Sequence, residues 1–184
     1  MADHRRPHVS AAQALIGSIA QARALRASWQ GQRHVGILLP PSVAGALANV
    51  AAPLCGKTSV NLNYTVGRIG LEAAVRQAGL RTVVTSRAFV EKAKLELPAG
   101  PAIIWIEDLA ETISRRDKWL AALLGFLTPM RVIEKACGQD TPLSVDALAT
   151  IIFSSGSTGE PKGVMLSHYL SLIHISEPTR PLYI

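Results

Sequence analysis

Aromatic residues are scarce in this chain, at 5% of its 184 residues, although hydrophobic residues of all kinds reach 48%. The core is therefore expected to consist of Ala, Val, Leu and Ile side chains rather than of stacked rings. With a mean hydropathy of +0.24, the composition argues against disorder and is compatible with one folded domain.

Cysteine is almost absent. Cys55 and Cys137 occur in unrelated contexts, which excludes a disulfide framework and a cysteine-based metal site. Two reduced thiols are typical of a cytosolic protein. The polar segment 1–7 is not followed by an apolar core, so it does not resemble a secretory signal. We expect a cytoplasmic protein, with association to the inner face of the cell membrane as an open possibility.

Acidic residues are fewer than basic ones, 13 against 19, and the formal net charge is +6. Such a balance suits a membrane surface, a nucleic acid or an anionic substrate. The sequence has no basic run interleaved with aromatics and no helix-turn-helix, zinc-finger or RNA-binding signature. Nucleic acid is therefore not expected as a partner.

Long hydrophobic runs are also missing. The uncharged stretch 34–56 is divided by Pro40 and Pro41, which predicts a buried strand at 35–39 and a helix over 42–52 rather than a transmembrane helix. Pro41 is expected to open this helix, and Pro53 with Gly56 to end it.

The rest of the chain alternates between the two kinds of element. Further helices are predicted at 10–28, 66–78 and 89–95, and further strands at 59–63, 81–85, 102–106 and 149–153. This alternation predicts an α/β fold built from βαβ units, with a mostly parallel sheet covered on both faces.

Residues 107–136 interrupt the alternation. Within 115–131 an apolar run that begins at Trp119 is flanked by Arg115, Arg116, Lys118 and Arg131. The run is too short to span a bilayer. Two interpretations stay open: an ordinary helix packed on the sheet, or a segment that makes peripheral contact with a membrane.

The strand at 149–153 leads into a polar loop that contains the candidate ligand-binding residues. Ser154, Ser155, Ser157 and Thr158 supply hydroxyls, and Lys162 supplies a mobile charge. Gly156, Gly159 and Gly163 are expected to let the backbone turn with positive φ and approach a ligand, so that backbone N–H groups bind an anion. Pro161 is expected to stiffen the chain before Lys162. Such a loop is suited to binding the β and γ phosphates of ATP.

Other interpretations of this segment are less favourable. A Walker A loop needs Gly-Lys-Ser/Thr followed by a helix, whereas Pro161 precedes the lysine here and 164–166 favours a strand. A flexible Gly/Ser linker rarely has a Pro-Lys-Gly tail between two apolar strands. Glu160 is expected to be a solvated loop residue, and Lys57 a charge at a helix end.

The segment Ser-Ser-Gly-Ser-Thr-Gly-Glu-Pro-Lys-Gly-Val at 154–164 resembles the phosphate-loop signature of the AMP-binding, adenylate-forming superfamily. The resemblance covers about 9–169. Segments 34–42, 56–65, 77–79 and 85–89 are similar to a subgroup that contains the acyl-[acyl-carrier-protein] synthetase part of the bifunctional enzyme that reacylates 2-acylglycerophosphoethanolamine. His168, after Ser167, matches a Ser/Thr-His pair that is common in the family.

This resemblance implies a function and its partners. Nucleotide contacts would come from Ser154, Ser155, Gly156, Ser157, Thr158, Gly159 and Lys162. ATP and Mg²⁺ would be needed, and no catalytic residue is assigned beyond Lys162 as a phosphate stabiliser. A fatty acid would become acyl-AMP and then pass to acyl carrier protein or CoA. The alternatives are a long-chain acyl-CoA synthetase and a non-catalytic nucleotide-binding module.

The end of the chain departs from the family pattern. Residues 170–184 resemble a translated sequencing adapter, so we expect 1–169 to be the N-terminal part of an AMP-binding domain and 170–184 to be a non-native tail. The family's acyl pocket, its later nucleotide motifs and its small C-terminal domain would then be missing. The chain alone is expected to be inactive and marginally stable.

Overall fold

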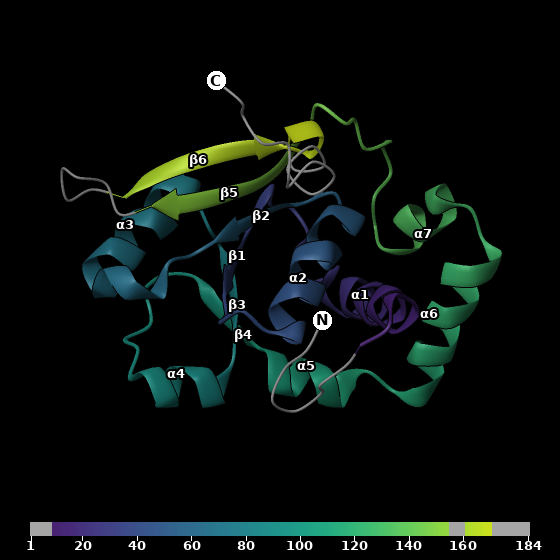
Figure 1. Cartoon of the computed structure of the whole chain (residues 1–184), viewed down its shortest axis with the longest axis horizontal. Coiled ribbons are helices and arrows are strands. Elements are labelled where there is room, and N and C mark those ends of the chain that lie inside the picture. Colours follow the sequence, from purple (N-terminus) through teal and green to yellow (C-terminus); the bar gives the residue numbers. More distant parts are fainter. Residues whose placement is uncertain (1–8, 155–160, 171–184) are drawn as a thin grey trace, which may run out of the picture.

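A computed structural model of the chain describes residues 9–154 and 161–170 (Figure 1). The helices are α1 (Ala11–Leu25), α2 (Val43–Leu54), η1, a 3₁₀ turn (Tyr64–Val66), α3 (Gly67–Ala78), α4 (Arg87–Ala93), α5 (Ile106–Thr112), α6 (Arg115–Leu127) and α7 (Met130–Ala136). The strands are β1 (His34–Leu38), β2 (Thr58–Asn61), β3 (Thr82–Thr85), β4 (Ala102–Trp105), β5 (Leu148–Ser154) and β6 (Lys162–Ser167).

The six strands form one sheet in the order β4-β3-β1-β2-β5-β6. Its first five strands are parallel, with Gly36 of β1 beside Val60 on one side and beside Val83 on the other. Strand β6 is antiparallel to β5 and forms one edge of the sheet. The predicted α/β fold with a mostly parallel sheet is confirmed.

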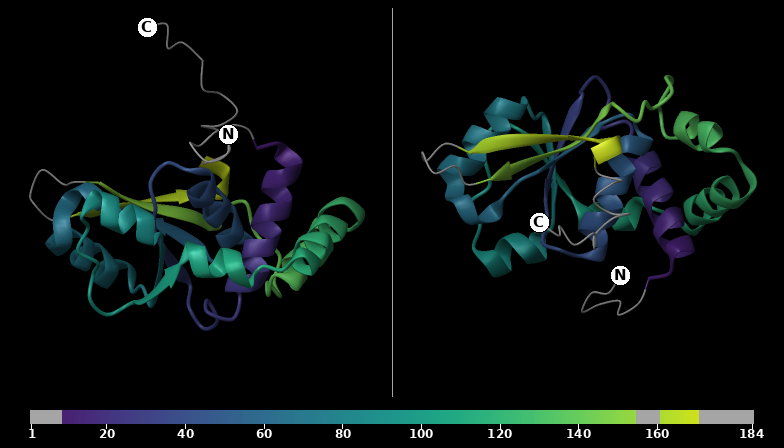
Figure 2. Two further views of the ribbon diagram at one scale, coloured as in Figure 1. Left: turned by 90° about the horizontal axis from the view of Figure 1, so that it is seen from below. Right: turned by 45° about the horizontal axis from the view of Figure 1, so that its top comes forward.

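Alternate side chains of the strands enter two separate apolar clusters. Val84 and Ile104 belong to the cluster beneath α1, α2, α5 and α6, whereas their neighbours Val83 and Ile103 belong to the cluster beneath α3. In Figures 1 and 2, α3 and α4 lie on one side of the strands and α1, α2 and α6 on the other. The sheet is thus covered on both faces, as predicted for parallel strands.

The prolines around α2 act differently from the prediction. Pro41 lies before the helix, and Ser42 is the N-cap, whose Oγ accepts a hydrogen bond from the Gly45 N–H at 3.2 Å. A serine N-cap takes this role because its hydroxyl satisfies an N–H that has no partner in the helix. Pro53 does not end the helix but lies in its last turn, and the chain leaves the helix at Gly56, which has a φ of +67°. Segment 34–56 is a strand and a helix, as predicted.

Other helix and strand boundaries also differ slightly from the predicted ones, and caps explain the differences. Strand β2 ends at Asn61, since the Asn63 side chain caps the 3₁₀ turn instead of extending the strand. Helix α4 begins at Arg87, two residues before the prediction, because Ser86 accepts a hydrogen bond from the Phe89 N–H. Helix α3 ends at Gly79 in the left-handed conformation, as expected for a C-terminal glycine.

The segment that interrupts the alternation contains the three helices α5, α6 and α7. Ser114 and Asp117 form a capping box that starts α6. Of the two interpretations left open, the one that placed this helix on the sheet is corrected in one respect, because α6 packs on α1. Ala121 and Leu124 are its buried residues, and a Cβ on Gly125 would lie 3.3 Å from both Leu15 and Ile19. Among the described residues, no helix is long and apolar enough to cross a bilayer.

Candidate functional site

The predicted phosphate loop connects β5 to β6 in an antiparallel hairpin. Ser154, the last residue of β5, lies opposite Lys162, the first residue of β6. Because β5 runs parallel to β2, with Ile152 beside Asn61, the loop leaves the sheet at the edge where β1, β2 and β3 also end. Ligands of open α/β sheets bind beyond the carboxyl ends of the strands.

The structure places only part of the predicted site. Ser155, Gly156, Ser157, Thr158 and Gly159 lie outside the described residues, as does Glu160, so their roles remain predictions. Ser154 and Lys162 are brought together at the base of the loop. The Lys162 side chain is exposed, and Pro161 beside it is buried. The strand–loop–strand arrangement excludes a helix after the lysine, and so confirms that this is not a Walker A loop.

Apolar packing fixes the base of the hairpin. Ile151 and Phe153 are buried in the cluster beneath α3. A Cβ on Gly163 would lie 3.2 Å from both Ile151 Cγ2 and Phe153 Cε1. Gly163 does not have a positive φ, so the expectation that it serves as a turn residue is wrong. Its lack of a side chain instead makes room for the Phe153 ring, which lies opposite it across the hairpin.

A polar network ties β5 to its neighbours on the other face. Thr150 Oγ1 accepts hydrogen bonds from Ser59 Oγ at 3.0 Å and from Asn61 Nδ2 at 3.1 Å, and donates to the Ser59 carbonyl at 3.0 Å. The side-chain amides of Asn49 and Asn61 bind each other reciprocally at 2.9 and 3.0 Å. The Asn49 Nδ2 group also donates to the Gly45 carbonyl at 3.0 Å. Sequence reasoning missed this network, and its only signal was two asparagines in apolar segments.

This network borders a cavity of about 540 Å³ at the carboxyl ends of β1 and β2. Its apolar lining includes Leu39, Pro40 and Leu62, and its polar lining comes from Ser42, Asn49, Asn61, Asn63 and Tyr64. Among the residues that the structure describes, those lining it carry no charged side chain. This described part of the lining suits an uncharged group.

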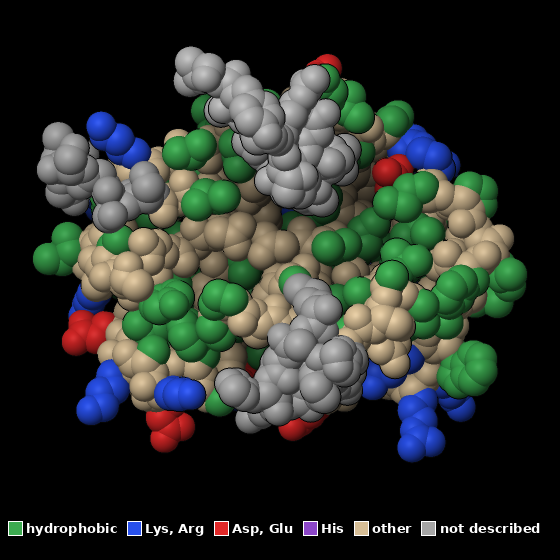
Figure 3. Space-filling model, in the orientation of Figure 1, with side chains coloured by type: hydrophobic (Ala, Val, Ile, Leu, Met, Phe, Trp, Pro, Cys, Tyr) green, Lys and Arg blue, Asp and Glu red, His purple; other side chains and the backbone are tan. Residues whose placement is uncertain are grey.

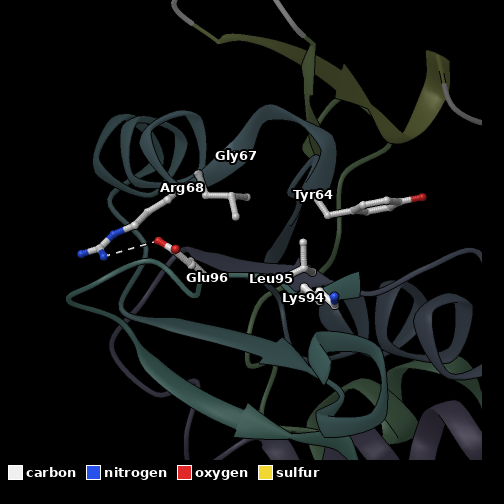
Figure 4. A pocket seen from close by; sticks show the side chains of 7 residues that line it. Tyr64, Gly67, Arg68, Lys94, Leu95 and Glu96 are labelled. Atoms are coloured by element: carbon white, nitrogen blue, oxygen red, sulfur yellow. Dashed lines mark ion pairs between the residues drawn. The ribbon is translucent and has the colours of Figure 1, made fainter. Parts of the chain in front are cut away.

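A smaller cavity of about 300 Å³ lies between η1, the start of α3 and the segment after α4 (Figure 4). Tyr64 lines both cavities. The Arg68 guanidinium forms ion pairs with Glu72 at 2.8 Å and with Glu96 at 3.6 Å. The hydrogen bond from Arg68 lowers the pKa of the Glu72 carboxyl. Exposed pairs of this kind contribute little to stability, so we assign the Arg68 pairs no role in the chemistry.

The other candidates occupy structural positions. His168 follows β6, and its backbone N–H donates to the Ala147 carbonyl at 3.1 Å. Partial burial lowers the pKa of its imidazole, which favours the neutral ring. Lys57 follows α2, as expected for a charge at a helix end, and its N–H donates to the Ala52 carbonyl at 2.9 Å. Within 9–154 and 161–170, no group of three or more His, Cys, Asp or Glu side chains could hold a metal ion.

The sequence of the hairpin predicts groups that could bind a polyphosphate chain. Ile151 and Phe153 are buried at the base of the hairpin, and the hydroxyls and glycines of 155–159 are known from the sequence. Hydroxyl, N–H and ammonium donors are the groups that bind phosphate oxygens in proteins. Ser154, Lys162 and the loop between them, which lies outside the described residues, therefore remain the predicted ligands of ATP, which Mg²⁺ would accompany.

Comparison with known proteins gives the family. The family model described as AMP-binding enzyme matches residues 8–177. The chain is 37% identical over 136 residues to 4-coumarate–CoA ligase 5 of Oryza sativa subsp. japonica, covering 73% of this chain and 23% of the relative. It is 44% identical over 85 residues to the carboxylic acid reductase of Mycobacterium marinum, covering 46% of this chain and 6% of the relative.

Solved structures share the fold. O-succinylbenzoate coenzyme A synthetase from Bacillus subtilis, in complex with AMP, superposes with a TM-score of 0.67 at 22% identity and covers 96% of this chain and 40% of its own. The fatty acyl-adenylate ligase from L. pneumophila gives a TM-score of 0.61 at 20% identity and covers 89% and 26%, respectively.

The chain spans about a quarter of the length of the rice ligase. Family model, relatives and fold agree, and the chain belongs to the AMP-binding enzyme family.

Proposed function

We propose that the chain is the part of an ATP-dependent acid–thiol ligase that binds the phosphates of the nucleotide, and that the ligase acts on fatty acids. A carboxylate oxygen attacks the α-phosphorus of ATP, the bond to pyrophosphate breaks, and the acyl-AMP then passes its acyl group to a thiol. The observation that carries this proposal is the β5–β6 hairpin, which sets Ser154 opposite Lys162 at the carboxyl edge of the sheet.

Positioning is the main task of these residues. The loop hydroxyls and N–H groups would orient the β and γ phosphates, and the Lys162 ammonium would neutralise charge that grows on the leaving pyrophosphate. The hydrogen bonds among Thr150, Ser59 and Asn61 would keep β5 in register with β2. The start of the loop would then lie level with the carboxyl ends of the neighbouring strands.

The proposal also specifies which acid is activated and which thiol accepts the acyl group. The similarity of segments 34–42 and 56–65 to acyl-[acyl-carrier-protein] synthetases supports a fatty acid, acyl carrier protein as acceptor and a role in phospholipid metabolism; CoA and a long-chain acyl-CoA synthetase are the alternative. An aromatic acid is a second candidate substrate, favoured by the 37% identity to a ligase whose name specifies 4-coumarate.

ATP–pyrophosphate exchange tests the proposal on the longest natural polypeptide that contains this chain. Fatty acids of several lengths and 4-coumarate are compared as substrates, and then acyl carrier protein and CoA as acceptors. Exchange that depends on a fatty acid supports the proposal, and exchange with 4-coumarate alone would replace the fatty acid with an aromatic one. Nucleotide binding without exchange would support the non-catalytic module.

Variants test the loop itself. Thr158→Ala combined with Lys162→Ala should lower exchange by about 100-fold, the scale reported for removal of transition-state hydrogen-bond donors. Lys92→Ala, which removes an exposed charge on α4, is the matched control. Unchanged exchange in the double variant would remove the role we assign to the loop.

The site of action and the activity of the chain alone are also proposals. We place the protein in the cytoplasm, in contact with the inner face of the membrane through 115–131. The 184 residues alone are proposed to lack exchange activity. Exchange by the isolated chain would contradict this last point without affecting the assignment of the loop.

A further inference from the structure

Helix α6 exposes a nearly continuous apolar face. Trp119, Leu123 and Phe126 have relative exposures of 79%, 53% and 61%, and their spacing places them on one side of the helix. The neighbouring apolar side chains that are also exposed are Leu120, Leu127 and Met130. We call these six side chains the α6 apolar face. Exposed apolar side chains gathered in this way mark an interaction site.

Packing fixes the direction of this face. The opposite side of α6 carries the buried Ala121 and Leu124, together with Gly125 in close contact with Leu15 and Ile19 of α1. Ala121 and Gly125 are small and let the two helices approach closely. A rotation of α6 to hide Trp119 would bring bulky side chains against α1, so the α6 apolar face is held outward.

Basic side chains flank the α6 apolar face at both ends. Arg115, Arg116 and Lys118 lie in the first turn of α6, and Arg131 and Lys135 lie in α7. With Asp117 and Glu134, the segment 115–135 has a net charge of +3, half of the +6 of the whole chain. Figure 3 shows hydrophobic side chains along the edge of the molecule formed by α6 and α7, with Lys and Arg side chains near its two ends.

We propose that the α6 apolar face docks on an anionic phospholipid surface, with α6 lying in the plane of the headgroups. The 13 residues of α6 extend about 20 Å at 1.5 Å per residue, enough to lie along a membrane but not to cross it. Tryptophan favours the interface between headgroups and acyl chains, and each nearby Lys or Arg adds attraction to anionic lipid. The basic residues at both ends favour an anionic lipid surface over an uncharged protein groove.

This proposal is independent of the phosphate loop. It predicts that the 184-residue chain cosediments with vesicles of phosphatidylcholine and phosphatidylglycerol, and binds vesicles of phosphatidylcholine alone at least tenfold more weakly. Brominated acyl chains should quench Trp119, which is exposed, and leave Trp29, which is fully buried, unquenched. Trp119→Phe keeps the apolar character and should keep vesicle binding while losing the quenching.

Two sets of variants separate the apolar and basic contributions. Trp119→Ser with Phe126→Ser should weaken binding at least tenfold because both side chains lose their contact with the acyl region. Arg115→Gln, Arg116→Gln and Lys118→Gln together should weaken it by on the order of 100-fold, from about fivefold for each charge. Their matched controls are Ile69→Ser on α3 and Lys92→Gln on α4, which are exposed elsewhere, and far-ultraviolet circular dichroism checks that every variant is folded.

Several results would overturn the proposal. They are the absence of cosedimentation with anionic vesicles, an equal loss in the control variants, and equal binding to neutral vesicles. Self-association in sedimentation equilibrium that Trp119→Ser abolishes would identify the face as an interface between two copies, and would also overturn lipid docking.

Discussion

At the residue scale, Gly163 shows how one residue type can serve a purpose other than the expected one. A glycine near a phosphate loop suggests a backbone that turns with positive φ. In the structure Gly163 is an ordinary strand residue that has no room for a side chain beside Phe153. The sequence could not show this, because the two residues meet only through the antiparallel register of β5 and β6.

Gly163→Ala is therefore expected to destabilise the fold by about 1–3 kcal/mol, the usual cost of adding a methyl group to a packed site. Urea unfolding measures the change. Met165→Ala alters an exposed side chain of the same strand and should stay within about 0.5 kcal/mol of the parent chain. Equal stability of the parent chain and Gly163→Ala would show that Phe153 can move aside without cost.

The surroundings of the two cysteines determine the pKa values of their thiols. Burial raises the pKa of the Cys55 thiol to about 12, and Cys137 nearby adds to this effect. Burial raises the pKa of the Cys137 thiol to about 11. The thiolate is the reactive form, so both thiols should react with an aromatic disulfide at pH 8 much more slowly in the folded chain than in urea.

The raised pKa values of the two thiols also predict how the stability of the fold depends on pH. Because both folded pKa values lie above the unfolded value of about 9, their contribution to stability is complete below pH 9 and is lost as the pH rises towards 12. Replacing both cysteines with alanine should remove this part of the alkaline destabilisation in urea titrations. An unchanged alkaline slope in the double variant would assign the loss to other groups.

At the scale of elements, the type and order of most segments could be predicted from the sequence. The apolar runs that became β1, β3 and β4, and the periodic segments that became α1 and α3, were each recognisable on their own. Boundaries depended on side-chain caps such as Ser42 and Ser86. The packing of α6 on α1, and the alignment of Asn49 with Asn61, depend on contacts between distant segments that a local pattern does not contain.

Thr150→Val tests the polar network between β2 and β5. The valine keeps the shape of the side chain but removes the hydroxyl that bonds Ser59 and Asn61. Leaving these partly buried groups without a partner should cost about 1–3 kcal/mol in the free energy of unfolding. Thr141→Val, at an exposed threonine, is the control. Equal effects of the two changes would show that the network contributes no stability.

Ser114→Ala tests the start of α6. The serine hydroxyl accepts from the Asp117 N–H and donates to the Asp117 carboxylate. The bonds that this carboxylate accepts from the Ser114 hydroxyl and backbone N–H lower its pKa. Loss of the cap should cost about 1 kcal/mol, measured by thermal unfolding at pH 7. The effect should shrink as the pH falls through the folded pKa of Asp117, whereas a pH-independent effect would contradict the role of the carboxylate.

At the scale of the whole molecule, the exposed apolar residues gather in two places, α6 and the edge strand β6. Val164 and Met165 are exposed on β6, and an edge strand offers unpaired backbone groups to a neighbouring chain. Light scattering of the chain should therefore rise with concentration. Met165→Lys should lower this association, and Ile69→Lys on α3 should not. Equal scattering by the parent chain and Met165→Lys would exclude β6 as the contact.

The two apolar clusters on opposite faces of the sheet affect how unfolding can be observed. Trp29 is the fully buried tryptophan, and it belongs to the cluster beneath α1 and α2. The cluster that holds Ile151 and Phe153 contains no tryptophan. Fluorescence from Trp29 therefore monitors the opposite half of the molecule, and following the hairpin would need a new fluorophore beside it whose signal can be told apart from that of Trp105, which lies 5.0 Å from the Arg87 guanidinium of α4, and that of the exposed Trp119.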